Sequence, residues 1–116
     1  MKVIIAGSRT FNNYKLLEET MNSLALPIDE IVCGCALGAD NLGEKWAKSK
    51  NIPVTYFYPD WSMYDKSGGI IRNRQMGDYA DYLVAFWDKK SRGTADMIHY
   101  MQQLGKCGKV IFFNND

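Results

Sequence analysis

Three short segments of the chain concentrate the residue types that bind anions. They are residues 7–10 (Gly-Ser-Arg-Thr), residues 34–40 (Gly-Cys-Ala-Leu-Gly-Ala-Asp) and residues 91–94 (Ser-Arg-Gly-Thr). Each follows a short apolar run and precedes a segment whose apolar residues have helical spacing. A helix N-terminus offers unpaired backbone N–H groups and the positive end of the helix dipole, which favour a phosphate or a similar anion. The pattern predicts a ligand site built from these three segments.

The side chains of the first and second segments offer specific contacts. Arg9 can hold a phosphate with two N–H groups, while Gly7 lets a ligand or a neighbouring turn approach the backbone and Ser8 can cap the next helix. Asp40 has two roles open to it, as a helix cap or as a ligand contact. The residues of these two segments expected at the site are Gly7, Ser8, Arg9, Gly34, Gly38, Ala39 and Asp40.

Two further segments complete the predicted site. Ser91, Gly93 and Thr94 resemble a phosphate cradle, although a plain cap with Asp96 in the first helical turn would have the same pattern. In residues 68–74, Arg72 and Arg74 point about 200° apart on a helix, so only one can face the site, and we expect Arg72 with Asn73. Trp87 can stack on a base or cover the core, and Asp88 can orient a sugar.

The sequence gives little support for a metal site or for a nucleophilic mechanism. Cys33, Cys35 and Cys107 lack the two-pair spacing of a zinc site, so reduced thiols, no metal and no cofactor are expected. His99 has no obvious acidic partner nearby in the sequence, and no Ser-His-Asp pattern can be recognised.

Five apolar, β-rich runs precede or follow these segments. Between the runs, apolar residues recur with the spacing of a helix. The runs are residues 3–6, 30–33, 54–58, 82–86 and 109–113. This alternation predicts an α/β fold, a three-layer Rossmann-like sandwich with a parallel five-stranded sheet of order 3-2-1-4-5 in one domain, residues 1–116. The ligand crevice of such a sheet opens between its first and fourth strands.

Composition narrows the function classes. The net charge of +1 argues against sequence-independent binding of nucleic acid. The apolar runs are far too short to span a membrane, and residues 1–6 lack the pattern of a signal peptide, so a cytoplasmic protein is expected.

Taken together, these motifs resemble the SLOG superfamily, in particular its small YspA/CpYpsA-related branch, along nearly the whole chain. The pieces that carry the resemblance are residues 3–9, 34–40, 46–47, 60–61, 72–73, Met76, 85–88 and 91–94. The resemblance implies a Rossmann-like fold and a site for a nucleotide or nucleotide-derived ligand. It also implies pairing into a homodimer, since relatives commonly pair.

Relatives in the superfamily include cytokinin-activating phosphoribohydrolases and DNA-processing protein A, which binds single-stranded DNA. The phosphoribohydrolases resemble this chain in their Gly-Thr loop, but Met97 stands where they carry a catalytic Glu. Leu37 stands where an Arg is typical of the branch. The first departure removes the catalytic carboxylate of that mechanism, and the second removes one anion contact.

The sequence therefore favours a protein that binds or senses a phosphorylated, nucleotide-type small molecule. The alternative is an enzyme that cleaves the N-glycosidic bond of a nucleoside monophosphate, with Asp96, Asp88 or Asp40 as its carboxylate. A third interpretation, binding of single-stranded nucleic acid through Trp61, Trp87 and the arginines, is opposed by the near-zero charge. Whether the chain catalyses any reaction is left open.

Overall fold

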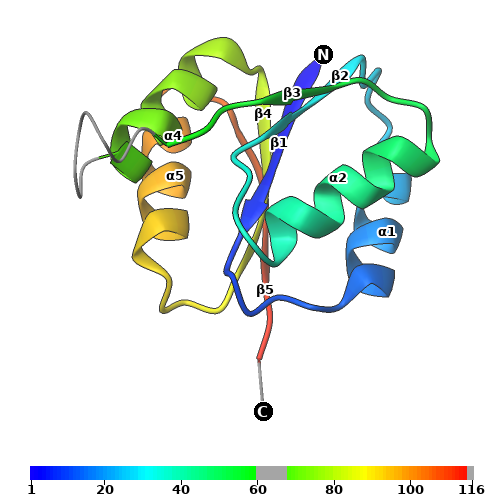
Figure 1. Ribbon diagram of the computed structural model, residues 1–116, viewed down its shortest axis with the longest axis horizontal. Coiled ribbons are helices and arrows are strands. Elements are labelled where there is room, and N and C mark those ends of the chain that lie inside the picture. The colour runs from blue at the N-terminus through cyan, green and yellow to red at the C-terminus, as the bar shows by residue number, and fades with distance from the viewer. Residues whose placement is uncertain (60–67, 115–116) are drawn as a thin grey trace.

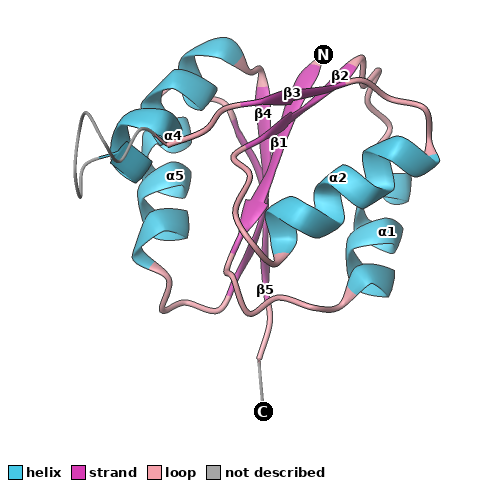
Figure 2. Cartoon of the chain, viewed as in Figure 1, coloured by secondary structure: helices cyan, strands magenta, loops and turns pink. Residues whose placement is uncertain are grey.

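The computed structural model describes residues 1–59 and 68–114. Figures 1 and 2 show its strands as a central sheet with helices on either side. The strands are β1 (Lys2–Gly7), β2 (Glu30–Cys33), β3 (Val54–Tyr56), β4 (Tyr82–Trp87) and β5 (Cys107–Phe112). The helices are α1 (Tyr14–Ser23), α2 (Ala39–Ser49), α4 (Gly68–Tyr79) and α5 (Arg92–Gln103).

The sheet is parallel throughout, and its order is β3-β2-β1-β4-β5. The predicted fold class and strand order are therefore confirmed. The chain winds outward from β1 in one direction and then returns to place β4 on the other side of β1. This change of direction lies between β1 and β4, where an open α/β sheet leaves room for a ligand.

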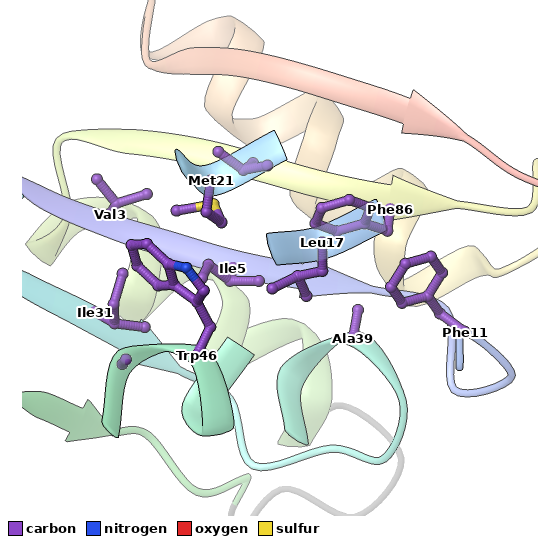
Figure 3. Close-up of a cluster of buried hydrophobic side chains, with 11 residues drawn as sticks. Val3, Ile5, Phe11, Leu17, Met21, Ile31, Ala39, Trp46 and Phe86 are labelled. Carbon is purple, nitrogen blue, oxygen red and sulfur yellow. The ribbon is translucent and has the colours of Figure 1, made fainter. Parts of the chain in front are cut away.

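Alternating side chains of the central strands face two separate cores. In β1, Val3 and Ile5 point into the core under α1 and α2, whereas Ile4 and Ala6 point into the core under α4 and α5. A period of two residues in a strand produces this division. Figure 3 shows the first core, in which Trp46 of α2 lies among strand side chains.

Aromatic stacking closes the first core at the carboxyl end of the sheet. The Phe11 ring stacks on Phe86 with centroids 4.7 Å apart, and it meets Phe113 edge to face at 4.9 Å. Phe11 lies in the loop between β1 and α1, so this stacking fixes the loop that carries Ser8 and Arg9. The core thereby positions one wall of the predicted site.

Some element bounds differ from the sequence prediction. The third strand ends at Tyr56 rather than at residue 58, because its partner β2 ends at Cys33 and the register pairs Cys33 with Tyr56. The fifth strand begins earlier than predicted, at Cys107, which pairs with Leu83 next to a register shift in β4. The predicted pieces Asp60 and Trp61 lie outside the described residues.

Candidate functional site

The loops after β1 and β4 are joined at the centre of the sheet. The Ser8 N–H donates to the Phe86 carbonyl at 2.9 Å, and the Asp88 N–H donates to the Ser8 hydroxyl at 3.1 Å. A Cβ on Gly7 would lie only 2.2 Å from the Phe86 carbonyl oxygen. Gly7 therefore serves close contact between two strands, and Ser8 is buried as the link between their loops.

The loop after β2 turns sharply before α2 begins. Gly38 has a φ of +76°, and a Cβ there would lie 2.4 Å from the Ser8 carbonyl oxygen. Cys35 adopts a φ of 62°, which non-glycine residues rarely adopt. Gly38, rather than Asp40, is the residue that precedes the first turn of α2, so the capping role open to Asp40 is not the one it takes.

Asp40 is a buried carboxylate on the wall of a cleft. Its side chain, in a residue only 5% exposed, accepts a hydrogen bond from the Ala36 N–H at 3.4 Å. Burial raises the pKa of Asp40 to about 6, against the opposing effects of the Arg72 charge and of nearby backbone N–H groups. A carboxyl group with this pKa changes its charge close to neutral pH.

The polar side chains in the first turns of α4 point in different directions. Arg72 donates to the Gly34 carbonyl through one terminal nitrogen and to the Asn73 side-chain oxygen at 3.2 Å through Nε. Arg74 instead forms two hydrogen bonds with Asp96, at 2.9 and 3.0 Å, and lies over the Tyr100 ring. Arg72 lines the cleft, whereas Arg74 joins α4 to α5.

Asn73 connects α4 to the start of α5. The residue is 5% exposed, and its side-chain nitrogen donates to the Gly93 carbonyl and to Asp96, both at 3.1 Å. These bonds fix the position of Gly93 relative to Arg72. The first turn of α5 is therefore held in place by a side chain from another helix.

Ser91 caps α5, and Asp88 supports the turn before it. The Ser91 hydroxyl accepts from the Thr94 N–H at 3.4 Å. Asp88 accepts from the N–H groups of Lys90 and Ser91, at 2.8 and 2.9 Å, which lowers the pKa of its carboxyl group. Both side chains thus shape the loop from which α5 begins.

The three predicted segments meet at one cleft of about 460 Å³, a size typical of small-molecule sites. Its wall combines buried polar groups, exposed cations and two methionines on α4 and α5. The residues that line it are Ala6, Gly7, Ser8, Arg9, Thr10, Ala36, Asp40, Arg72, Asn73, Met76, Asp88, Lys90, Ser91, Gly93, Thr94 and Met97.

A second hollow of about 330 Å³ adjoins this cleft. Gly34, Cys35, Pro59, Gly69 and Ile70 line it, together with residues that also line the larger cleft. We call the two spaces the larger and the smaller hollow. Gly34 is thus placed beside the cleft, where a Cβ would lie 2.9 Å from a carboxylate oxygen of Asp40.

Three of the residues predicted to bind the ligand line neither hollow. Gly38 and Ala39 pack against the loop after β1, and Ala39 is fully buried. Trp87 donates its ring N–H to the Ser91 carbonyl at 3.0 Å and lies beside Phe112, so it supports the loop before α5. Sequence reasoning missed Met76, Met97 and Lys90 as cleft residues, although Lys90 sits in the predicted loop after the fourth strand.

Asp96 departs from its predicted place. No acidic residue lies in the first turn of α5, because the helix begins at Arg92 and Asp96 lies in the second turn. Its carboxylate is held by Arg74 and Asn73, whose hydrogen bonds lower its pKa although partial burial opposes them. Asp96 therefore joins two helices and does not line the cleft.

The cysteines are all free thiols. Cys33 is buried, and burial raises its pKa to about 12, whereas Cys35 is exposed. Within residues 1–59 and 68–114, no three His, Cys, Asp or Glu side chains gather closely enough to hold a metal ion. Among the helices that the structure describes, none is long and apolar enough to cross a membrane.

The fold and the cleft define a small Rossmann-like protein whose polar loops converge at the carboxyl ends of its central strands. The model of the YspA, cpYpsA-related SLOG family matches residues 1–64, and the chain belongs to that family. It is similar to the Gene 61 protein of Mycobacterium phage D29, with 28% identity over 117 residues that cover 92% of this chain and 90% of the relative. No solved structure matches the chain.

Proposed function

We propose that the protein binds a phosphorylated, nucleotide-derived small molecule in the cleft between the loops after β1 and β4. The observation that carries the proposal is the position of Arg9, Arg72 and the backbone at Gly93 around one cleft. A Cβ at Gly93 would have no atom within 4 Å, so the backbone there is open to a ligand. Family membership supports a nucleotide-related ligand.

The physical basis of the proposal is electrostatic. Arg72 is held by the Gly34 carbonyl and by Asn73, so its charge is positioned before a ligand arrives. The first N–H groups of α5 have no partner within the helix, and the helix dipole adds a partial positive charge there. An anion in the cleft would meet both groups.

Titration calorimetry with nucleoside mono-, di- and triphosphates tests this proposal. We expect at least one nucleotide to bind, and Arg9→Ala to weaken its binding by about tenfold or more, the effect of losing a charged hydrogen bond. Lys15→Ala is the control, because Lys15 is an exposed cation on α1 that lines neither hollow. Absence of heat with every nucleotide, from folded protein, would contradict the proposal.

One observation favours a second candidate function, hydrolysis of an N-glycosidic bond. Of the three carboxylates considered, Asp40 combines burial with a place on the cleft wall, whereas Asp96 is bound by Arg74 and Asp88 by backbone N–H groups. A charged Asp40 would stabilise the cationic sugar that forms as the base leaves and water adds to its anomeric carbon.

Chromatography of nucleoside monophosphates incubated with the protein tests this second function. If the enzyme reaction occurs, base release should fall as the pH drops below about 6, because Asp40 becomes protonated, and Asp40→Asn should abolish it. Wild-type protein that releases no base between pH 5 and 8 would rule this function out while leaving the binding proposal intact.

A further inference from the structure

Two thiols stand on either side of a single glycine where β2 ends, in the sequence Cys33-Gly34-Cys35. Each thiol contacts the backbone of the other cysteine. The Cys35 N–H donates to the Cys33 sulfur at 3.3 Å, and the Cys35 thiol donates to the Cys33 carbonyl at 3.8 Å. The Cys33 sulfur therefore already lies against Cys35, as a disulfide between the two residues requires.

The two thiols differ in their access to solvent. Cys33 is 3% exposed, whereas Cys35 is exposed and lines the smaller hollow. Burial raises the pKa of Cys33 to about 12, and the neighbouring Cys35 thiol adds to the rise, although the hydrogen bond from the Cys35 N–H opposes it. A reagent in solution therefore meets Cys35 first. Cys33 can react only with a group that is already attached to its neighbour.

We infer that Cys33 and Cys35 form a reversible disulfide by exchange with a low-molecular-weight disulfide. The Cys35 thiolate attacks one sulfur of the small disulfide, which forms a mixed disulfide and releases one thiolate. Cys33 gives up its proton and attacks the Cys35 sulfur, which releases the second thiolate. Each released thiolate takes up one proton. The protein has then lost two hydrogen atoms, and its two electrons have reduced the small disulfide to two thiols.

The second step is favoured by proximity. The high pKa of Cys33 leaves little thiolate at neutral pH, but the mixed disulfide on Cys35 is held beside the Cys33 sulfur. An attack within one molecule gains the advantage of a very high effective concentration. The internal disulfide should therefore replace the mixed disulfide.

The small size of the ring makes this disulfide easy to reduce. Residues 33–35 are the whole loop that it closes, so it restricts the unfolded chain very little. Strain in so short a ring raises the reduction potential, as in labile and regulatory disulfides. An excess of thiol should accordingly restore both cysteines. The pair suits a response to oxidation and not a permanent support of the fold.

The ring would contain the carbonyl group that positions Arg72. The Gly34 carbonyl accepts from Arg72, and the N–H of Ala36, directly after the ring, donates to Asp40. A Cβ on Gly34 would lie 2.9 Å from an Asp40 carboxylate oxygen and 3.0 Å from an Arg72 nitrogen, so the loop packs tightly against both side chains. Closing the ring should therefore displace Arg72 and weaken nucleotide binding, a consequence that rests on the proposed function.

Mass spectrometry of the folded protein after incubation with glutathione disulfide tests the site. Free thiols are alkylated before digestion with trypsin, which keeps Cys33 and Cys35 together in residues 16–45 and separates them from Cys107. We expect residues 16–45 to lose two hydrogen atoms and to take up no alkyl group, and excess reduced glutathione to reverse the change. A stable mixed disulfide on Cys35, or alkylation of both cysteines, would overturn the inference.

Three variants, each checked for its fold by circular dichroism, separate the steps. Cys33→Ala should stop at the mixed disulfide on Cys35, and Cys35→Ala should leave the buried Cys33 unmodified. Cys107→Ala is the control and should form the disulfide as the wild type does, because Cys107 lies at the start of β5 and takes no part. Modification of Cys33 in folded Cys35→Ala at the wild-type rate would overturn the order of attack.

Calorimetry with nucleoside mono-, di- and triphosphates tests the effect on the cleft. We expect the oxidised protein to bind about tenfold more weakly than the reduced protein. The affinity of Cys35→Ala should not respond to glutathione disulfide. Equal affinity of the oxidised and reduced wild type would overturn the effect on the cleft. If the reduced protein binds no nucleotide, the proposed function is wrong, whereas the mass of residues 16–45 still decides the disulfide.

Discussion

Asp40 is held in place by hydrogen bonds, yet the burial of its negative charge is unfavourable for folding. Its carboxylate accepts from the Ala36 N–H at 3.4 Å and is favoured by other nearby backbone N–H groups and by the Arg72 charge, but its burial outweighs these effects. Buried charges of this kind reduce stability and are retained at sites where they act on a ligand. The cost to folding can be measured directly.

Stability should therefore fall as pH rises through the titration of Asp40. The pKa of its carboxyl group is about 6 in the folded protein against an ordinary value of 3.8, so the folded state binds more protons between these values. The free energy of unfolding then decreases from about pH 4 to about pH 6. We expect Asp40→Asn to remove this decrease and to raise the free energy of unfolding at pH 7.5 by about 1–3 kcal/mol.

Urea unfolding of both proteins at pH 4.5 and pH 7.5 provides the measurement. Glu19→Gln is the control, since Glu19 is exposed on α1, and we expect it to change the free energy of unfolding by less than about 0.5 kcal/mol. An Asp40→Asn protein no more stable than the wild type at pH 7.5 would show that burial of the charge carries no cost.

At the scale of elements, the start of α5 is held by side chains from the preceding loop and from α4. Ser91 caps the helix, Asp88 accepts from two backbone N–H groups, and Asn73 of α4 holds the Gly93 carbonyl. The position of the α5 N-terminus at the cleft therefore depends on its cap. The cap of α1, Asn13, has the same local role but lies away from the cleft.

Comparing variants that lack one cap or the other should separate the effect of a cap on stability from its effect on binding. Ser91→Ala and Asn13→Ala should each lower the free energy of unfolding by about 1 kcal/mol, because each leaves a first-turn N–H group without its acceptor. Only Ser91→Ala should also weaken nucleotide binding. Chemical denaturation and calorimetry measure the two effects, and equal affinity of the two variants would show that the α5 start makes no contact with the ligand.

The strands were predictable from the sequence, whereas the roles of the polar residues were only partly so. The apolar runs and the intervals between them were sufficient for a parallel sheet with helices on both faces, since such a sheet buries both faces of its strands, and the Rossmann-like order was then chosen for it. Helical geometry was sufficient to separate Arg72 from Arg74. The difference between Asp40 and Asp96 was not predictable, because the partner of Asp96 is Arg74, which lies in another helix. Such contacts depend on how the helices pack.

At the scale of the whole molecule, β1 and β4 join the two halves of the sheet. The loops that carry Ser8 and Asp88 extend from these two strands, so the cleft depends on the same contact that holds the halves together. Gly7 is the last residue of β1, and a Cβ there would collide with the Phe86 carbonyl oxygen of β4. Gly93, by contrast, borders the cleft with space around it.

Gly7→Ala and Gly93→Ala should accordingly have opposite consequences. We expect Gly7→Ala to lower the free energy of unfolding by about 3 kcal/mol or more, since backbone must move to admit the methyl group. Gly93→Ala should leave stability unchanged or raise it by up to about 1 kcal/mol, yet reduce nucleotide affinity by about tenfold. Thermal unfolding and calorimetry distinguish them, and tight binding by Gly93→Ala would place the ligand away from this helix start.

The three thiols differ in exposure, which should allow one of them to be labelled selectively. Cys35 is exposed on the rim of the smaller hollow, whereas Cys33 is buried and burial raises the pKa of both Cys33 and Cys107. A maleimide dye should consequently label Cys35 ahead of the other two positions. A dye at Cys35 would also occupy part of the smaller hollow, so labelling should weaken nucleotide binding without any substitution in the chain.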